Sequence, residues 1–162
     1  MNGTCYIGID PAFRERGFAI CIIDEVKDVD FKIFHSFLSF LDWIVAAPDN
    51  VIVCIENSNL QNATFNMNGN KAQVASMSRD VGKNMAASQY TVDSCVKFFG
   101  DENTLELSPK EKGAKIKDNR IILGMGKKEG HTFMKKTFNQ DERDAYKLAY
   151  LAIEWHKKQI RK

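Results

Sequence analysis

The segment that most constrains the fold is residues 51–56, in which five consecutive apolar residues are followed by Glu56. A continuous apolar run of this length is typical of a strand whose two faces are both covered by other elements. Residues 5–10 have the same character, a short apolar run that ends in Asp10. If the two strands are neighbours in one sheet, Asp10 and Glu56 emerge side by side at the same edge.

The rest of the chain alternates between strand and helix patterns, and its 162 residues suit a single domain, 1–162. The expected strands are 5–10, 18–23, 31–37, 51–56 and 104–107, and the expected helices are 38–47, 71–99 and the segment from 141 onward. Residues 110–136 have no regular pattern. This order predicts an α/β fold, a mixed five-stranded sheet with helices on both faces.

Composition excludes several classes of protein. Hydrophobic residues make up 44% of the chain and charged residues 27%, which is ordinary for a globular domain. The amino-terminal sequence does not resemble a signal peptide, and no apolar stretch approaches the roughly 18 residues that span a bilayer. The four cysteines have no paired spacing, which indicates buried free thiols in a reducing compartment. We therefore expect a cytoplasmic protein without a membrane segment.

Charge is divided unevenly along the chain. Residues 1–109 contain 8 Lys and Arg against 14 Asp and Glu, whereas residues 110–162 contain 15 against 7. A basic third of this kind can present a face that binds a polyanion such as nucleic acid. A lysine-rich surface exposed to solvent is an equally good explanation of the charge alone.

Two further acids stand at the start of the last expected helix. Asp141 and Asp144 are three residues apart, so both project from one side of its first turn, on the same stripe as Leu148. Taken singly, Asp10 could be a turn residue, and the helical acids could complement the helix dipole. Glu56 is harder to explain in this way, because an acid that ends an apolar strand needs a partner or a metal.

Taken together, the four acids predict a metal site. Carboxylates held close together repel one another and have raised pKa values unless a cation neutralises them. Oxygen ligands of this type suit Mg²⁺, with Mn²⁺ as the alternative. Two such ions about 4 Å apart can activate water and stabilise the leaving oxygen of an in-line phosphoryl displacement. The four acids therefore predict a metal site suited to this chemistry.

Three motifs, in this order, resemble those of the RuvC-type Holliday junction resolvases, a family of the RNase H-like superfamily. They are Ile7-Gly8-Ile9-Asp10-Pro11 with Gly17-Phe18-Ala19, then Val53-Cys54-Ile55-Glu56, then Asp141-Glu142-Arg143-Asp144-Ala145 followed by Leu148-Ala149. The resemblance covers nearly the whole chain. It implies an RNase H-like fold and a Mg²⁺-dependent endonuclease that nicks four-way (Holliday) or other branched DNA junctions in recombination and repair. It also implies that the catalytic metal ligands are Asp10, Glu56, Asp141 and Asp144.

The resemblance also implies partners and contacts. The helix from Lys71 to Phe99 matches the element through which the family forms homodimers, although an ordinary core helix is the alternative. The loop after Glu56 matches the place of an apolar residue that wedges into the junction. Phe65 is the first candidate for this wedge and Leu60 the second, and either could instead be a core contact.

The basic segment 110–117 falls where the family places lysines near the scissile phosphate. Lys112 and Lys115 are the candidates there, because a flexible ammonium group can contact phosphate or stabilise the transition state. Other lysines would add affinity for the DNA backbone that is independent of sequence. These are Lys117, Lys127 and Lys128, together with Lys135 and Lys136.

The chain also departs from the bacterial pattern. It has Asp10-Pro11-Ala12 where those enzymes usually have Asp-Pro-Gly, and its asparagine-rich loop 57–70 is unlike theirs. Both features are closer to a phage-type member that cuts branched DNA more broadly, in the cytoplasm of a bacterium or of a virus-infected cell.

Two other functions stay open. One is an RNase H-like nuclease that acts on RNA or on an RNA–DNA hybrid. The other is an actin-like nucleotide-binding module, which needs a second glycine-rich phosphate loop. Gly124-Met125-Gly126 is a poor match to such a loop.

Overall fold

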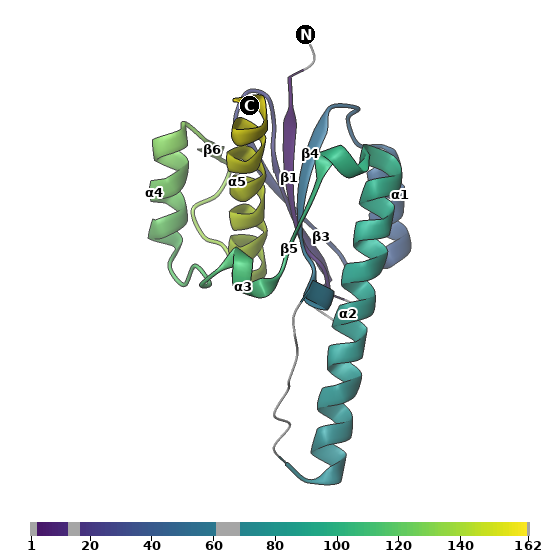
Figure 1. Cartoon of the computed structure of the whole chain (residues 1–162). Helices are drawn as coiled ribbons and strands as arrows, with labels where there is room; N and C mark the ends of the chain where they lie inside the picture. The colour runs from purple at the N-terminus through teal and green to yellow at the C-terminus, as the bar shows by residue number, and fades with distance from the viewer. Residues whose placement is uncertain (1–2, 13–16, 61–68, 162) are drawn as a thin grey trace.

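The computed structural model describes residues 3–12, 17–60 and 69–161. Within this part of the chain, one mixed sheet has six strands in the order β5-β4-β1-β2-β3-β6 (Figure 1). The strands are β1 (Cys5–Asp10), β2 (Phe18–Ile23), β3 (Asp28–Phe34), β4 (Val51–Glu56), β5 (Thr104–Leu107) and β6 (Thr132–Phe133). The expected mixed α/β fold is confirmed, with one strand more than expected: the two-residue β6 lies in the segment without a regular pattern and pairs with β3.

The described helices cover both faces of this sheet, as expected (Figure 1). They are α1 (Phe37–Val45), α2 (Lys71–Phe99), α3 (Pro109–Lys112), α4 (Asn119–Glu129) and α5 (Gln140–Ile160), with short 3₁₀ turns η1 (Ser58–Leu60) and η2 (Asp101–Asn103). α1 and α2 pack on one face, and α4 and α5 pack on the other. None of the described helices is long and apolar enough to cross a membrane.

The central strand β1 shows how the two layers meet the sheet. Ile7 and Ile9 are fully buried in the cluster that includes α1 and α2. Gly8, between them, faces α5, and a Cβ at this position would overlap the backbone of Ala145 and Ala149. The missing side chain therefore allows the α5 backbone to lie directly on β1.

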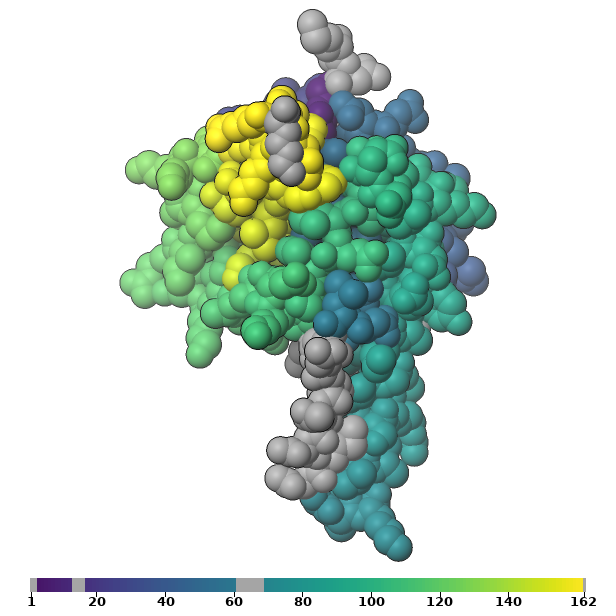
Figure 2. Space-filling view, in the orientation of Figure 1, coloured from purple at the N-terminus to yellow at the C-terminus, as the bar shows by residue number. Residues whose placement is uncertain are grey.

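The long helix α2 is divided into two parts. Its buried residues all lie between Ala87 and Cys95, where the helix packs on the sheet. Residues of α2 before Asn84, which itself lines a cavity of the body, extend past the end of the sheet, and Figure 2 shows this part of α2 standing out from the body of the molecule. The second half of α2 is therefore a core helix, whereas the first half is mostly exposed within the described part of the chain.

The cysteines are all buried and free, as predicted: Cys5, Cys21, Cys54 and Cys95. Burial and the nearby negative charge of Asp24 raise the pKa of the Cys5 thiol to about 11. Thiols with raised pKa values are poor nucleophiles and poor metal ligands. These residues therefore act as small apolar core side chains.

Candidate active site

A cavity of about 350 Å³ opens at the carboxyl ends of β1 and β4. All six residues predicted to be catalytic line it: Asp10, Glu56, Asp141, Asp144, Lys112 and Lys115. They come from five separate segments of the chain, namely β1, β4, α5, α3 and the loop after α3. The fold thus brings together every catalytic candidate from the sequence.

The sheet register places the first two acids. β1 and β4 are parallel, and Ile9 is paired with Ile55. Asp10 and Glu56 are the next residues on the two strands, so they leave the sheet side by side. Burial and the negative charge of Glu56 raise the pKa of Asp10 to about 7, in spite of the opposing effect of Lys112.

Helix α5 supplies the other two acids. It begins after Asn139, whose side chain accepts a hydrogen bond from the backbone N–H of Glu142 at 2.9 Å. Because α5 lies directly on Gly8, its first turns reach the end of β1. Asp144 is only 1% exposed, and it lines the cavity together with the more exposed Asp141. Both acids therefore face the sheet edge, as their spacing predicts.

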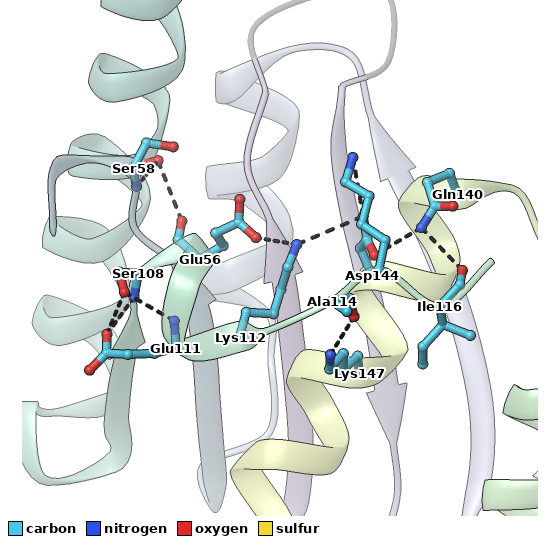
Figure 3. A network of polar contacts seen from close by, with 12 residues as sticks. Glu56, Ser58, Ser108, Glu111, Lys112, Ala114, Ile116, Gln140, Asp144 and Lys147 are labelled. Atoms are coloured by element: carbon cyan, nitrogen blue, oxygen red, sulfur yellow. Dashed lines mark hydrogen bonds and ion pairs between the residues drawn. The ribbon is translucent and has the colours of Figure 1, made fainter. Parts of the chain in front are cut away.

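Lys112 lies between Glu56 and Asp144 (Figure 3). It is only 5% exposed, and its ammonium forms ion pairs with Oε2 of Glu56 and, at 3.7 Å, with Oδ2 of Asp144. Burial alone would lower the pKa of Lys112, but the carboxylates of Asp10 and Glu56 outweigh this effect and raise it. The ammonium is therefore charged and partly neutralises the acids.

The short helix α3 brings Lys112 to this position. Ser108 follows β5 directly, and its hydroxyl accepts a hydrogen bond from the backbone N–H of Glu111 at 3.2 Å. In return, the Glu111 carboxylate accepts one from the backbone N–H of Ser108 at 2.8 Å. This reciprocal capping, with Pro109 at the first helical position, fixes the start of α3. Lys112 then projects back across the end of β4.

Lys115 is placed differently. Its Nζ lies 4.0 Å from Oδ2 of Asp144, but its side chain is 60% exposed. The surrounding loop is fixed to α5, because Lys147 donates to the carbonyl of Ala114 at 2.6 Å and Arg143 donates to that of Ile116 at 2.9 Å. Lys115 can therefore reach both the acids and a molecule that enters from solvent.

The sequence reasoning missed three residues that organise this site: Gln140, Arg143 and Lys147. Gln140 donates to Asp144 at 2.9 Å. It precedes Asp144 by four residues, the spacing at which such pairs form on a helix, so this contact could have been anticipated. Arg143 and Lys147 bind backbone carbonyls more than twenty residues away, which no local pattern indicates.

The acidic side chains that line the cavity are all carboxylates, the type of ligand that a hard divalent cation takes. The pKa of Asp10 stays raised although Lys112 is charged, so more positive charge would stabilise the site. In the described part of the chain, however, no three Asp, Glu, His or Cys residues are grouped closely enough to hold a metal ion. The ammonium of Lys112 lies between Glu56 and Asp144 and contacts both.

The residues predicted to contact DNA are more dispersed. Leu60 is 49% exposed in η1, close to the end of β4, whereas Phe65 lies outside the described residues. The exposed Lys117 is two residues from Lys115. The remaining candidates lie outside the cavity: Lys127 and Lys128 in the last turn of α4, and Lys135 and Lys136 after β6. Lys135 forms an ion pair with Glu142 on α5.

Comparison with known proteins gives a match in structure alone. No protein-family model matches the sequence, and neither does any curated protein. Among solved structures, RuvC of T. thermophilus, in complex with a Holliday junction substrate, matches with a TM-score of 0.50. The match covers 96% of each chain at 13% sequence identity, a level at which similarity concerns the fold. The chain has the RNase H-like fold that the sequence motifs predicted, in the form found in RuvC.

Proposed function

We propose that this chain is a divalent-metal-dependent endonuclease that cuts branched DNA, with four-way junctions as the first candidate substrate. The main support is the arrangement of four carboxylates and two lysines around one cavity, in a chain with the fold of RuvC. The structure of T. thermophilus RuvC contains a Holliday junction substrate, which favours the same class of substrate here.

The proposed metal ligands are Asp10, Glu56, Asp141 and Asp144, with Mg²⁺ as the expected ion and Mn²⁺ as the alternative. When bound, a divalent cation supplies Lewis acidity at the phosphodiester and makes water a better nucleophile at neutral pH. The contribution of the chain is to hold the carboxylates at the ends of two parallel strands and one helix, where the phosphate can reach them.

The two lysines have different roles in this proposal. Lys112 is buried and contacts Glu56 and Asp144, so it neutralises the acids and holds them together. Lys115 is exposed and 4.0 Å from Asp144, so its ammonium can donate to a non-bridging phosphate oxygen. Stabilising the negative charge of the transition state is the usual effect of such a group.

Binding of DNA would use surfaces beyond the cavity. The exposed Lys117, Lys127 and Lys128 would contact the phosphate backbone, which makes affinity strongly dependent on salt. Leu60 is half exposed beside the site and is a candidate for the residue that wedges into a junction. Phe65 stays the first candidate on sequence grounds.

The protruding half of α2 supports a homodimer as part of the proposal. Val74, Met77, Val81 and Met85 are spaced by three or four residues, so they form one apolar stripe on the helix. Within the described part of the chain Met77 and Met85 are exposed and Val74 and Val81 are half-buried, and an apolar stripe of this kind that is open to solvent is typical of an interface. A symmetric dimer would present two cavities to two strands of one junction.

Charge reversal on that stripe tests the dimer. We expect a Met77→Glu, Val81→Glu variant to sediment as a monomer and to stay folded, because this part of the helix is outside the core. A matched variant, Lys83→Glu, changes the charge of an exposed residue of the same helix and is expected to leave the dimer intact. A monomeric wild type would contradict the dimer.

The structure supports the two alternative functions to different extents. An RNase H-like nuclease of RNA or of an RNA–DNA hybrid would use the same carboxylates, so only its substrate separates it from the proposal. The nucleotide-binding module is not supported, because Gly124 and Gly126 lie within helix α4. Gly126 also packs against the ring of Phe133, so it is not free to bind phosphate.

A substrate panel tests the proposed function. Labelled four-way junction, flap, linear duplex and RNA–DNA hybrid are offered to the protein in Mg²⁺ and in EDTA. We expect cleavage of the junction and the flap, dependent on the metal, with little cleavage of linear duplex. Cleavage that persists in EDTA would contradict the metal-dependent mechanism, and preference for the hybrid would favour the RNA-directed alternative.

A further inference from the structure

Gln140, the first residue of α5, connects the acids of the cavity to the segment that carries Lys115. Its amide nitrogen donates to Oδ1 of Asp144 at 2.9 Å and to the carbonyl oxygen of Ile116 at 3.3 Å. Both contacts are visible in Figure 3. Gln140 thus contacts one proposed metal ligand and the backbone next to Lys115.

The orientation of the Gln140 amide is determined by Arg143. A guanidinium group can only donate hydrogen bonds, so the amide atom that Arg143 contacts at 3.1 Å is the oxygen. The nitrogen then points to Asp144 and Ile116, and both atoms it meets are acceptors. Every polar atom of the amide therefore has a partner of the right kind, which fixes this rotamer.

The Asp144 carboxylate is oriented as a consequence. Oδ1 accepts from Gln140, whereas Oδ2 lies 3.7 Å from the Lys112 ammonium and 4.0 Å from that of Lys115. The two oxygens therefore have separate roles: one is held by α5 itself, and the other is directed to the positive charges of the cavity. Without Gln140, rotation of the carboxylate would have no polar restraint on the Oδ1 side.

Ile116, whose carbonyl accepts the second hydrogen bond from Gln140, is fixed in the core. Ile116 is 7% exposed and packs in the cluster beneath α4 and α5. Its carbonyl also accepts from Nε of Arg143 at 2.9 Å. The same guanidinium binds the Phe138 carbonyl at 2.6 Å and the Asn119 side chain at 3.1 Å. Gln140 is therefore held by groups that are themselves fixed.

We propose that Gln140 is a positioning residue, which holds Asp144 in the orientation that presents Oδ2 to a bound cation and couples that orientation to the Lys115 segment. This inference rests on the proposed metal-dependent function. Hydrogen-bonding partners of metal ligands commonly change metal affinity by about 10- to 100-fold when they are lost. Loss of the Gln140 hydrogen bonds should therefore weaken metal binding even in the absence of DNA.

The test is a calorimetric titration with Mn²⁺ of the wild type and of Gln140→Met, which keeps the length of the side chain and removes its hydrogen bonds. We expect about tenfold weaker binding. Gln159→Met is the matched control, since Gln159 is an exposed residue of the same helix, far along the chain from the site. We expect the affinity of the control to equal that of the wild type. Circular dichroism confirms that each variant is folded at the titration temperature.

A second variant separates the hydrogen bond from side-chain size. Gln140→Leu also removes the hydrogen bonds but fills the site with a branched side chain and adds no charge, so we expect a loss of affinity similar to that in Gln140→Met. Unchanged affinity in Gln140→Met, or wild-type affinity in Gln140→Leu, would overturn the inference. Asp144→Asn distinguishes this failure from failure of the proposed function. If the wild type does not bind Mn²⁺, or if Asp144→Asn binds it equally well, both are wrong.

Discussion

Two parts of the cavity are built by different physical means. The carboxylate platform, which comprises Asp10, Glu56, Asp141 and Asp144, is placed by backbone packing: strand register sets the first two, and the contact of α5 with Gly8 sets the others. The lysine segment, residues 108–118, is placed by polar contacts: reciprocal capping by Ser108 and Glu111 fixes its start, and side chains of α5 bind the carbonyls of Ala114 and Ile116. The backbone of the platform should therefore move only when packing fails, whereas the backbone of the lysine segment should loosen when single hydrogen bonds are removed.

The largest expected effect comes from breaking the packing under the platform. In Gly8→Ala, the new Cβ meets the backbone of Ala145 and Ala149, so α5 must move away from β1. We expect the free energy of unfolding to fall by about 3 kcal/mol in urea titrations. Gly82→Ala is the matched control, because nothing lies within 4 Å of a Cβ there and alanine favours the helix. It should stabilise by about 0.5–1 kcal/mol. Equal effects of the two changes would contradict the packing account.

The next effect comes from removing the charge that joins the two parts. Lys112→Met leaves the nearly buried Glu56 and Asp144 without their ammonium partner, so we expect a loss of about 2 kcal/mol of unfolding free energy in EDTA. Added Mn²⁺ should recover part of that loss, because it supplies positive charge to the same carboxylates. The control Lys115→Met removes an exposed ammonium and should change stability little. If Lys112→Met were as stable as Lys115→Met, the burial of Lys112 would have no energetic role.

A smaller effect is expected from loosening the backbone of the lysine segment. Arg143→Met removes hydrogen bonds to the Ile116 and Phe138 carbonyls and to the side chains of Asn119 and Gln140, which should cost about 1.5 kcal/mol. Hydrogen exchange should become faster in the amides of residues 113–118 and stay unchanged in β1. Arg161→Met is the control, since Arg161 is an exposed residue at the end of α5, far along the chain from the lysine segment. Equally accelerated amide exchange in β1 and in the lysine segment would contradict the claim that different contacts hold the two parts in place.

The same distinction explains what the sequence could and could not predict. Strands β1 and β4 have continuous apolar runs, and Asp10 and Glu56 follow from placing those strands side by side. The three-residue spacing of Asp141 and Asp144 predicts that both side chains lie on the same side of α5. These are local sequence patterns, because packing in the sheet requires apolar residues at regular positions.

Other elements have no comparable local pattern. Helix α4 contains Gly124 and Gly126, which lower helix propensity, and only two of its residues are buried. Strand β6 has two residues and is defined by its pairing with β3. In the sequence, Arg143 is simply a helical residue between two acids. Its role depends on the backbone carbonyls of Ile116 and Phe138, which lie outside the helix.

The most direct test of the central claim, that the carboxylate platform is a nuclease site, is the single-turnover cleavage rate of a four-way junction in Mg²⁺. Asp144→Asn is compared with Asp42→Asn, which makes the same chemical change on the exposed side of α1. We predict a loss of at least about a hundredfold for Asp144→Asn and a rate close to that of the wild type for the control. Equal rates for the two variants, with both proteins folded, would contradict the account.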